Sequence, residues 1–241
     1  MTKTNTVTIW LGLDVHKALI AACWFVDTSE APCAETIPNT RKAVRGLLLR
    51  LGEKGEVRAC YEAGPCGYEV RRQLDGMGVR CDVVAPSLIP KKAGDHFKTD
   101  RRDARKLASL FRAGLLTSIL VPTKEQEAVR DLVRCREDVV VDGTRVWHRM
   151  IKFLLRHGRA WHKTQGGSKA HWEWLRAQKF EDPHQQRTHE EYLAQVDFQR
   201  ARRAALDTEI EAIAQQDPWK DRVERLRCLR GIGTLSALTL L

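Results

Sequence analysis

The chain has 241 residues, of which 43% are hydrophobic and 30% charged, and its 41 Lys and Arg residues exceed its 31 Asp and Glu residues to give a formal net charge of +10. This apolar content excludes a chain that is disordered throughout, and no apolar run approaches the roughly 20 residues that a membrane span requires. The surplus of positive charge favours a polyanionic partner, most often a nucleic acid.

Neither the N-terminal residues nor the cysteines indicate secretion. Residues 1–10 contain no charged leader followed by an apolar stretch and a small-residue cleavage site, so no secretory signal is expected. The seven cysteines are scattered and none forms a Cys-x-x-Cys pair, so neither a disulfide framework nor a zinc site is indicated. We therefore expect a cytoplasmic protein with no membrane partner.

The first 121 residues predict an α/β domain. Apolar runs predict strands at 7–13, 19–26, 57–61 and 79–84, with an edge strand near 35–37. Helical spacing or an amphipathic pattern predicts helices at 41–51, 68–77 and 100–114. The first two strands are separated by a few residues and should pair as a hairpin. The resulting order, β-β-β-α-β-α-β-α, places antiparallel strands first and βαβ units after them.

A long helical segment is predicted from residue 122 to residue 222. Apolar residues recur at spacings of three and four over ~30 residues after Pro122, and again from about His189 to Gln216. Two long helices with polar outer faces are typical of an antiparallel hairpin or a dimerising coiled coil, and an intramolecular helical bundle fits the pattern equally well.

Tryptophans and histidines are frequent in and around this segment. The cluster of Trp161, Trp172 and Trp174 indicates packing more than base stacking. The histidines show no zinc-ligand spacing and are expected at the surface or beside phosphates: His96, His148, His157, His162, His171, His184 and His189.

Four acidic residues occupy positions that favour metal chemistry. Asp14 and Glu62 each follow a buried strand, and ligands of open α/β sheets collect at that edge. Asp100 and Asp103 are three residues apart, so both project from one face of a helix start. Converging carboxylates repel one another unless cations lie between them, and two Mg²⁺ ions about 4 Å apart would meet that need and support phosphoryl transfer.

Each of these acids also has a purely structural interpretation. An Asp at a strand end commonly begins a turn, and Asp100 with Asp103 would suit a helix N-cap and its N3 partner. Basic residues interleave with the last two acids, namely Arg101, Arg102, Arg105 and Lys106. A phosphate site requires such positive charge, but a solvated helix face would show the same pattern.

The C-terminal residues contain a second candidate phosphate site. In Gly231-Ile-Gly233, two glycines flank an apolar residue between helical segments, and the backbone N–H groups of such a turn can hold a phosphate. The pattern resembles half of a helix-hairpin-helix motif, but a plain helix–helix turn fits equally well.

Three motifs, in order, resemble the DEDD transposases of the IS110 family of bacterial insertion sequences. They are Gly12-Leu-Asp14-Val-His-Lys17, Tyr61-Glu62-Ala-Gly-Pro-Cys-Gly-Tyr68 and Lys98-Thr-Asp100-Arg-Arg-Asp103-Ala-Arg105. The third motif is the most specific, and the resemblance extends the basic nucleic-acid-binding set to Lys98. The Gly231-Ile-Gly233 segment is similar to the opening of that family's C-terminal transposase domain, which would begin here near residue 223.

The resemblance implies an RNase H-like, RuvC-type catalytic domain at 1–121 in which Asp14, Glu62, Asp100 and Asp103 bind Mg²⁺. It further implies a coiled-coil segment, a homo-oligomer (a dimer or tetramer), DNA as substrate and a structured guide RNA. The family's nucleophilic serine belongs to the C-terminal domain; Ser236 lies too close to the Gly-Ile-Gly turn to match it, so no residue of this chain is assigned that role and the chain is expected to be truncated.

Other functions remain open at this point. A RuvC-type nuclease that cuts with water would need the same acids but would not use the long helices. An actin-like kinase or ATPase would need a second phosphate loop, and the best candidate, Asp142-Gly143-Thr144, falls within a helical pattern. A non-catalytic nucleic-acid scaffold would need only the basic helices.

Overall fold

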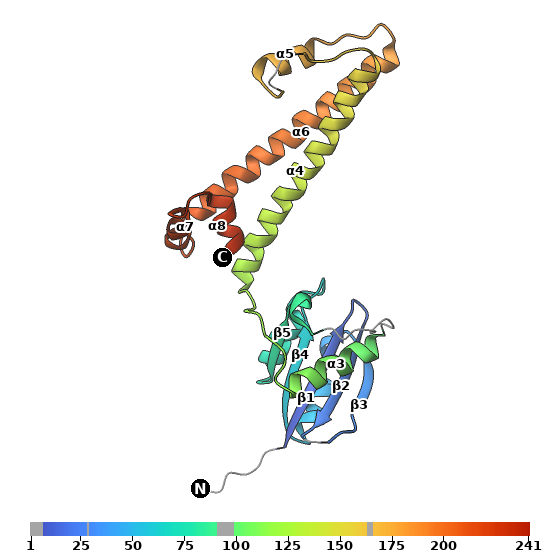
Figure 1. Cartoon of the computed structure of the whole chain (residues 1–241), viewed down its shortest axis with the longest axis vertical. Helices are drawn as coiled ribbons and strands as arrows, with labels where there is room; N and C mark the ends of the chain where they lie inside the picture. Colours follow the sequence, from blue (N-terminus) through green and yellow to red (C-terminus); the bar gives the residue numbers. More distant parts are fainter. Residues whose placement is uncertain (1–6, 28, 91–98, 163–165) are drawn as a thin grey trace. The chain divides into compact units, whose positions relative to one another are not determined.

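The computed structural model describes residues 7–27, 29–90, 99–162 and 166–241. The chain divides into two compact units, Met1–Val121 and Pro122–Leu241 (Figure 1). Of the residues considered above, Lys98 and His96 lie outside the described part of the chain.

The first unit is built on a five-stranded sheet in the order β3-β2-β1-β4-β5. Its strands are β1 (Thr8–Val15), β2 (Leu19–Val26), β3 (Cys33–Pro38), β4 (Glu56–Glu62) and β5 (Arg80–Val84). β1 pairs antiparallel with β2, which pairs antiparallel with β3, whereas β4 pairs parallel with both β1 and β5. This is the predicted arrangement of antiparallel strands followed by βαβ units, and it confirms an α/β, RNase H-like domain.

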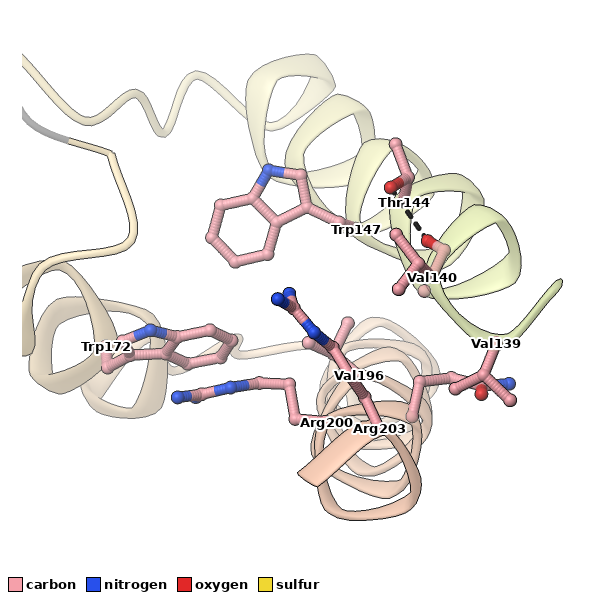
Figure 2. A pocket seen from close by; sticks show the side chains of 10 residues that line it. Val139, Val140, Thr144, Trp147, Trp172, Val196, Arg200 and Arg203 are labelled. Atoms are coloured by element: carbon pink, nitrogen blue, oxygen red, sulfur yellow. Dashed lines mark hydrogen bonds between the residues drawn. The ribbon is translucent and has the colours of Figure 1, made fainter. Parts of the chain in front are cut away.

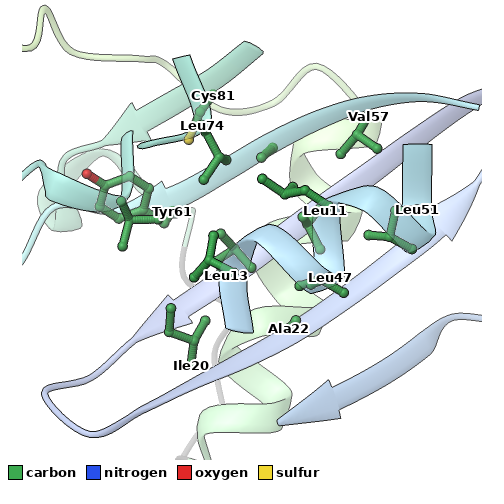
Figure 3. Packing of buried hydrophobic residues seen from close by; sticks show 14 of the residues in the cluster. Leu11, Leu13, Ile20, Ala22, Leu47, Leu51, Val57, Tyr61, Leu74 and Cys81 are labelled. Carbon is green, nitrogen blue, oxygen red and sulfur yellow. The ribbon is translucent and has the colours of Figure 1, made fainter. Parts of the chain in front are cut away.

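One face of the sheet carries the main hydrophobic core. Along β1, Ile9, Leu11 and Leu13 point to this face and are almost fully buried. They pack with apolar residues of helices α1 (Arg41–Gly52) and α2 (Glu69–Asp75) (Figure 3). Because side chains alternate along a strand, the residues between them point to the opposite face.

The opposite face is covered by helix α3 (Asp100–Arg112), which lies very close to the sheet. A Cβ atom added at Gly12 would lie 2.4 Å from the Ala108 nitrogen and 2.5 Å from the Ala104 oxygen. At the far end of the helix, Phe111 meets Trp10 edge to face with 5.3 Å between ring centroids. The small residue in β1 therefore allows α3 to run along β1, with its N-terminus toward the end of the strand that carries Asp14.

The N-terminus of α3 is capped by Thr99, not by Asp100. The Thr99 hydroxyl accepts a hydrogen bond from the Arg102 N–H, and Asp100 and Asp103 both lie in the first turn. The structural alternative in which Asp100 is the N-cap residue is therefore wrong. Both carboxylates still interact favourably with the positive end of the helix dipole. A 3₁₀ turn, Pro86–Leu88, follows β5.

The second unit is an antiparallel pair of long helices, α4 (Lys124–Arg156) and α6 (Pro183–Ala214) (Figure 1). The first was predicted closely. The second begins six residues earlier than predicted, because Asp182 caps it through two backbone N–H groups and Pro183 occupies the first helical position. The two helices pack within one chain, as the hairpin and bundle interpretations require.

Both ends of this helix pair carry a smaller helical element. Beside one end lies α5 (Lys169–Ala177), which was not predicted as a helix. At the other end α7 (Lys220–Arg227) and α8 (Thr234–Leu240) pack against α4 and α6 through a cluster that includes Val133, Ile210 and Trp219. The predicted turn between helical segments joins α7 to α8, and Gly231 there has a φ of 90°, which favours glycine.

Aromatic residues fill the end of the helix pair beside α5. Trp161 stacks on His171 with 4.8 Å between ring centroids and 16° between planes, and Trp147 meets His171 edge to face. The tryptophan cluster is thus packed, as predicted. The expectation of surface histidines is wrong for His171 and His189, which are buried. The His171 Nδ1 accepts a hydrogen bond from the Gly167 N–H, and the His189 Nε2 lies 3.0 Å from the Leu175 carbonyl oxygen.

Within the described residues, no helix combines the length and the apolar character needed to cross a membrane.

Candidate metal centre

Asp14 and Glu62 are held at the ends of two neighbouring parallel strands. The β1–β4 register pairs Leu13 with Tyr61, so the next residue on each strand is one of these two acids. Asp14 points to the same face as Gly12, which is the face covered by α3. Sequence reasoning placed both acids at one sheet edge, and the strand order brings them to neighbouring positions there.

Asp100 and Asp103 approach the same edge from α3. Residues three apart on a helix share a face, and here that face looks toward β1. The close packing at Gly12 sets the distance between the helix and the strand. Asp103 is partly buried, and Asp100 is exposed.

All four acids line one pocket with a volume of about 910 Å³. Its wall is completed by the hairpin after β1 and the loop after β4. The lining residues are Asp14, Val15, His16, Lys17, Asn39, Glu62, Ala63, Gly64, Pro65, Cys66, Asp100 and Asp103. Three separate elements therefore bring four carboxylates to one cavity.

His16 lies between two of the acids. Its Nε2 is 3.1 Å from Asp14 Oδ2 and 3.5 Å from Asp100 Oδ1. Sequence reasoning assigned no role to this histidine. The available signal was its position two residues after a strand-end aspartate, in the same strand-to-hairpin segment, but such a spacing is common in proteins without a site.

The electrostatics of the pocket disfavour ionisation of Asp14. Burial raises the pKa of this carboxyl above its usual value, and the nearby Asp100 and Asp103 raise it further, whereas the hydrogen bond from His16 lowers the pKa. The Asp14 side chain is 19% exposed, so part of the hydration of its charge has been removed. A cation bound beside Asp14 would offset both the burial and the repulsion.

The donor set fits a divalent cation. Carboxylate oxygens are the ligands that Mg²⁺ and Mn²⁺ prefer, and an imidazole nitrogen is acceptable to first-row transition metals. One ligand atom from each of Asp14, His16 and Asp100 lies within 4.8 Å of the others.

The predicted nucleic-acid-binding residues fall into two separate groups. Arg101, Arg102 and Arg105 are exposed on α3 and Lys106 is partly buried, while Lys98 is outside the described residues. Gly231 and Gly233 belong to the second unit, in the turn between α7 and α8.

A second pocket lies in the helical unit, between α4, α5 and α6 (Figure 2). It has a volume of about 200 Å³ and is lined by Val139, Val140, Gly143, Thr144, Trp147, Trp172, Val196, Gln199, Arg200 and Arg203. The Arg200 guanidinium lies 3.9 Å from the centroid of the Trp172 ring. Sequence reasoning did not pair these residues, because they belong to different helices.

In this domain an Asp, a Glu and two further Asp residues lie at a parallel-strand edge and a helix N-terminus of an RNase H-like sheet. This arrangement is typical of the DEDD class of nucleic-acid enzymes. The comparison with known proteins agrees: the model of the IS110 family of DEDD transposases, described as "Transposase", matches residues 11–158. The chain belongs to this family.

Two relatives are similar over nearly the whole chain. The transposase for insertion sequence element IS1533 of Leptospira borgpetersenii is 35% identical over 237 residues, which cover 97% of this chain and 68% of that protein. The protein named "Putative transposase y4qE" of Sinorhizobium fredii is 38% identical over 233 residues, which cover 95% of this chain and 56% of that protein. The chain therefore spans about two thirds of the first relative and just over half of the second.

Proposed function

We propose that this chain cuts and exchanges DNA strands in insertion-sequence transposition, with Asp14, Glu62, Asp100 and Asp103 as the residues that hold divalent metal. The observation that carries the proposal is that these acids, from β1, β4 and α3, line one pocket. The raised pKa of Asp14 adds support, because burial and the nearby Asp100 and Asp103 disfavour its charge, and a bound cation would offset both effects.

In this proposal the four carboxylates bind two Mg²⁺ ions, which when bound would polarise the scissile phosphate and activate the attacking group. The residues of the chain position those ions and the phosphodiester. Asp14 and Glu62 are fixed on neighbouring strands, and Asp100 and Asp103 are fixed on a helix packed directly against the sheet. Such anchoring on regular elements holds the ligands in place more firmly than loops would.

The exposed basic face of α3 provides the proposed DNA or RNA contact. Arg101 and Arg105 are one helical turn apart, as are Arg102 and Lys106, so each pair can follow consecutive phosphates. We propose the same role for Lys98 and for the backbone N–H groups near Gly231 and Gly233. A structured guide RNA and a dimeric or tetrameric state complete the proposal and rest on the family resemblance, as does the start of a C-terminal domain (223–241). The scattered cysteines favour a cytoplasmic location, and the apolar patterns favour a catalytic domain (1–121) followed by a coiled-coil segment (122–222).

Metal binding by the full chain tests the central claim directly. Isothermal titration with Mg²⁺ should give a saturable heat for the wild type, none for Asp14→Asn and a weakened one for Glu62→Gln. Glu56→Gln is the matched control, because Glu56 lies at the opposite end of the same strand as Glu62. Equal heats for wild type and Asp14→Asn would contradict the proposal.

Nucleic-acid binding is tested by its dependence on salt. Each phosphate contact that is lost should reduce the slope of log K against log salt by about 0.9 for duplex DNA. We expect this reduction for Arg101→Gln and Arg105→Gln, and no change for Arg80→Gln at the start of β5. A salt slope that is flat in the wild type would mean that the positive surplus serves only solubility.

A RuvC-type nuclease is the second candidate function. The observation that favours it is the acid pocket itself, because a nuclease of this type would use the same four carboxylates with water as the nucleophile. Metal-dependent cleavage that leaves free DNA ends, with no DNA bound covalently to any protein, would support the nuclease. Joined strands in the products would support the transposase.

A further inference from the structure

The position of His16 adds a nitrogen donor to a site otherwise made of carboxylates. We infer that His16 is a direct ligand of the cation held by Asp14 and Asp100, and that it makes this position bind Mn²⁺ more tightly than Mg²⁺. The inference rests on the proposed function, because it requires that the acid pocket binds a divalent metal.

The spacing of the donor atoms is that of a coordination shell. Metal–ligand distances near 2.1 Å place neighbouring ligands of an octahedral ion about 3 Å apart. The His16 Nε2 lies 3.1 Å from Asp14 Oδ2 and 3.5 Å from Asp100 Oδ1. An ion that replaces the proton between His16 Nε2 and Asp14 Oδ2 can therefore contact all three atoms after small side-chain adjustments.

The backbone of His16 is held in place by two hydrogen bonds. Its N–H donates to the Leu19 carbonyl at 2.9 Å across the β1–β2 hairpin. Its own carbonyl accepts a hydrogen bond from the Asn39 side chain at 2.8 Å. The ring is 53% exposed, yet its Nε2 faces the carboxylates. The two backbone hydrogen bonds fix where the side chain begins, and its Nε2 is directed at the carboxylates of the pocket.

The chemistry of the nitrogen determines which metal it favours. Mg²⁺ is a hard ion that takes oxygen ligands and gives up its bound water reluctantly. Mn²⁺ also prefers carboxylate and water oxygens, but as a first-row transition ion it accepts an imidazole nitrogen more readily than Mg²⁺ does. Replacing one water or oxygen by His16 should therefore stabilise bound Mn²⁺ and leave bound Mg²⁺ with little gain.

Electron paramagnetic resonance of Mn²⁺ bound to the full chain tests the inference without an activity assay. Wild type should show electron-spin-echo modulation from a directly bound ¹⁴N. His16→Gln should lose that modulation and bind Mn²⁺ about tenfold or more weakly, while Mg²⁺ affinity, measured by competition, changes by less than about threefold. His16→Glu should lose the nitrogen signal and shift the preference toward Mg²⁺. His184→Gln removes an exposed histidine of the helical unit and should change neither property.

Two results would overturn the inference, and they are distinguishable. If Mn²⁺ binds to wild type but not to Asp14→Asn, and no ¹⁴N coupling is present, His16 is not a ligand and the proposed function stands. If neither metal binds to wild type, the proposed function fails together with the inference. Circular dichroism of His16→Gln and His16→Glu establishes that each variant is folded before its spectrum is interpreted.

Discussion

The two units of the chain arrange acidic side chains in opposite ways. In the first, Asp14 lies near Asp100 and Asp103, and its pKa is raised by burial and by these like charges. In the second, Asp207 lies 2.7 Å from Arg136 and 3.4 Å from Arg203, and the hydrogen bond from Arg136 lowers its pKa. The helical unit therefore neutralises partly buried Asp207 with its own arginines, whereas in our proposal a bound metal ion supplies the positive charge for the acid pocket.

The two units also differ in whether their elements meet through backbone or through side chains. Backbone meets backbone where α3 crosses Gly12, so that small residues hold the acids close together. In the helical unit, the contacts between α4, α5 and α6 are made by large rings and guanidinium groups that line a pocket, as for Arg200 over Trp172. A site that depends on close backbone contact should tolerate less change than a helix pair that is filled by side chains. The predictions below test this difference.

The largest effect is expected for Gly12→Ala. Its new Cβ would lie within 2.5 Å of backbone atoms of α3, which cannot rotate away as a side chain could. We expect the first unit to lose about 3 kcal/mol of unfolding free energy, together with Mg²⁺ binding, because α3 carries Asp100 and Asp103. Urea denaturation and metal titration measure the two losses.

Gly46→Ala is the matched control for this substitution. Gly46 lies inside α1, and its added Cβ would meet nothing nearer than a side-chain nitrogen of Arg50 at 3.7 Å. This variant should gain up to about 1 kcal/mol from helix propensity. Similar stabilities for the two variants would show that α3 does not depend on contact with Gly12.

The second prediction concerns metal and the acid pocket. Mg²⁺ at about 100 times its Kd should stabilise the first unit by about 2.7 kcal/mol, equivalent to roughly 10 °C in Tm for a unit of this size. Asp14→Asn removes one of the repelling charges, so it should raise Tm without metal and abolish the further rise on adding Mg²⁺. Calorimetry should show the transition of the helical unit unchanged, since the described residues that line the pocket all belong to the first unit.

A rise in Tm with Mg²⁺ that persists in Asp14→Asn would place the bound ion elsewhere. A variant that is less stable than wild type without metal would show that burial and repulsion at Asp14 do not disfavour its charge. Addition of EDTA to wild type should return its Tm to the metal-free value.

The sequence predicted the sheet and the convergence of the acids for a clear physical reason. Strands buried on both faces appear as continuous apolar runs, and neighbouring parallel strands bring their ends to one edge. That reasoning placed Asp14 and Glu62 at one sheet edge, and helix periodicity placed Asp100 and Asp103 on one helix face. Their role as metal ligands remains a prediction.

Features that depend on contacts between distant segments could not be predicted in the same way. The burial of His189 depends on the carbonyl of Leu175, which belongs to a different helix. The place of His16 depends on a strand end and a helix start brought together by the fold. The start of α6 is different, because Asp182-Pro183 carries a recognisable N-cap followed by a proline at the first helical position, a local signal that the apolar spacing obscured.

The third prediction concerns pH and the helical unit. Burial lowers the pKa of His171 and of His189 below the usual value of 6.5. Since the unfolded chain then binds more protons than the folded chain below about pH 6.5, stability should fall as the pH falls through that value. Thermal melts between pH 7.5 and 5 should show the loss. His171→Phe keeps an aromatic ring beside Trp161 but cannot be protonated, so it should show a smaller pH dependence. A stability that rises toward pH 5 would contradict the assignment of neutral buried histidines.

The smallest expected effect separates ion pairs by their burial within the helical unit. Arg136 is 15% exposed and bonds Asp207 at 2.7 Å, whereas Arg145 is 65% exposed and bonds Asp142 at 2.9 Å within α4. Replacing Arg136 by Met leaves a partly buried carboxylate without its closest partner, so we expect a loss of about 1–2 kcal/mol. Arg145→Met, the matched control, should change stability by less than about 0.5 kcal/mol, because solvent already screens that pair. Urea denaturation at pH 7 measures both. Equal effects would mean that the helical unit gains no more stability from its partly buried ion pair than from its exposed one. The difference between the helical unit and the acid pocket would then rest on their packing alone.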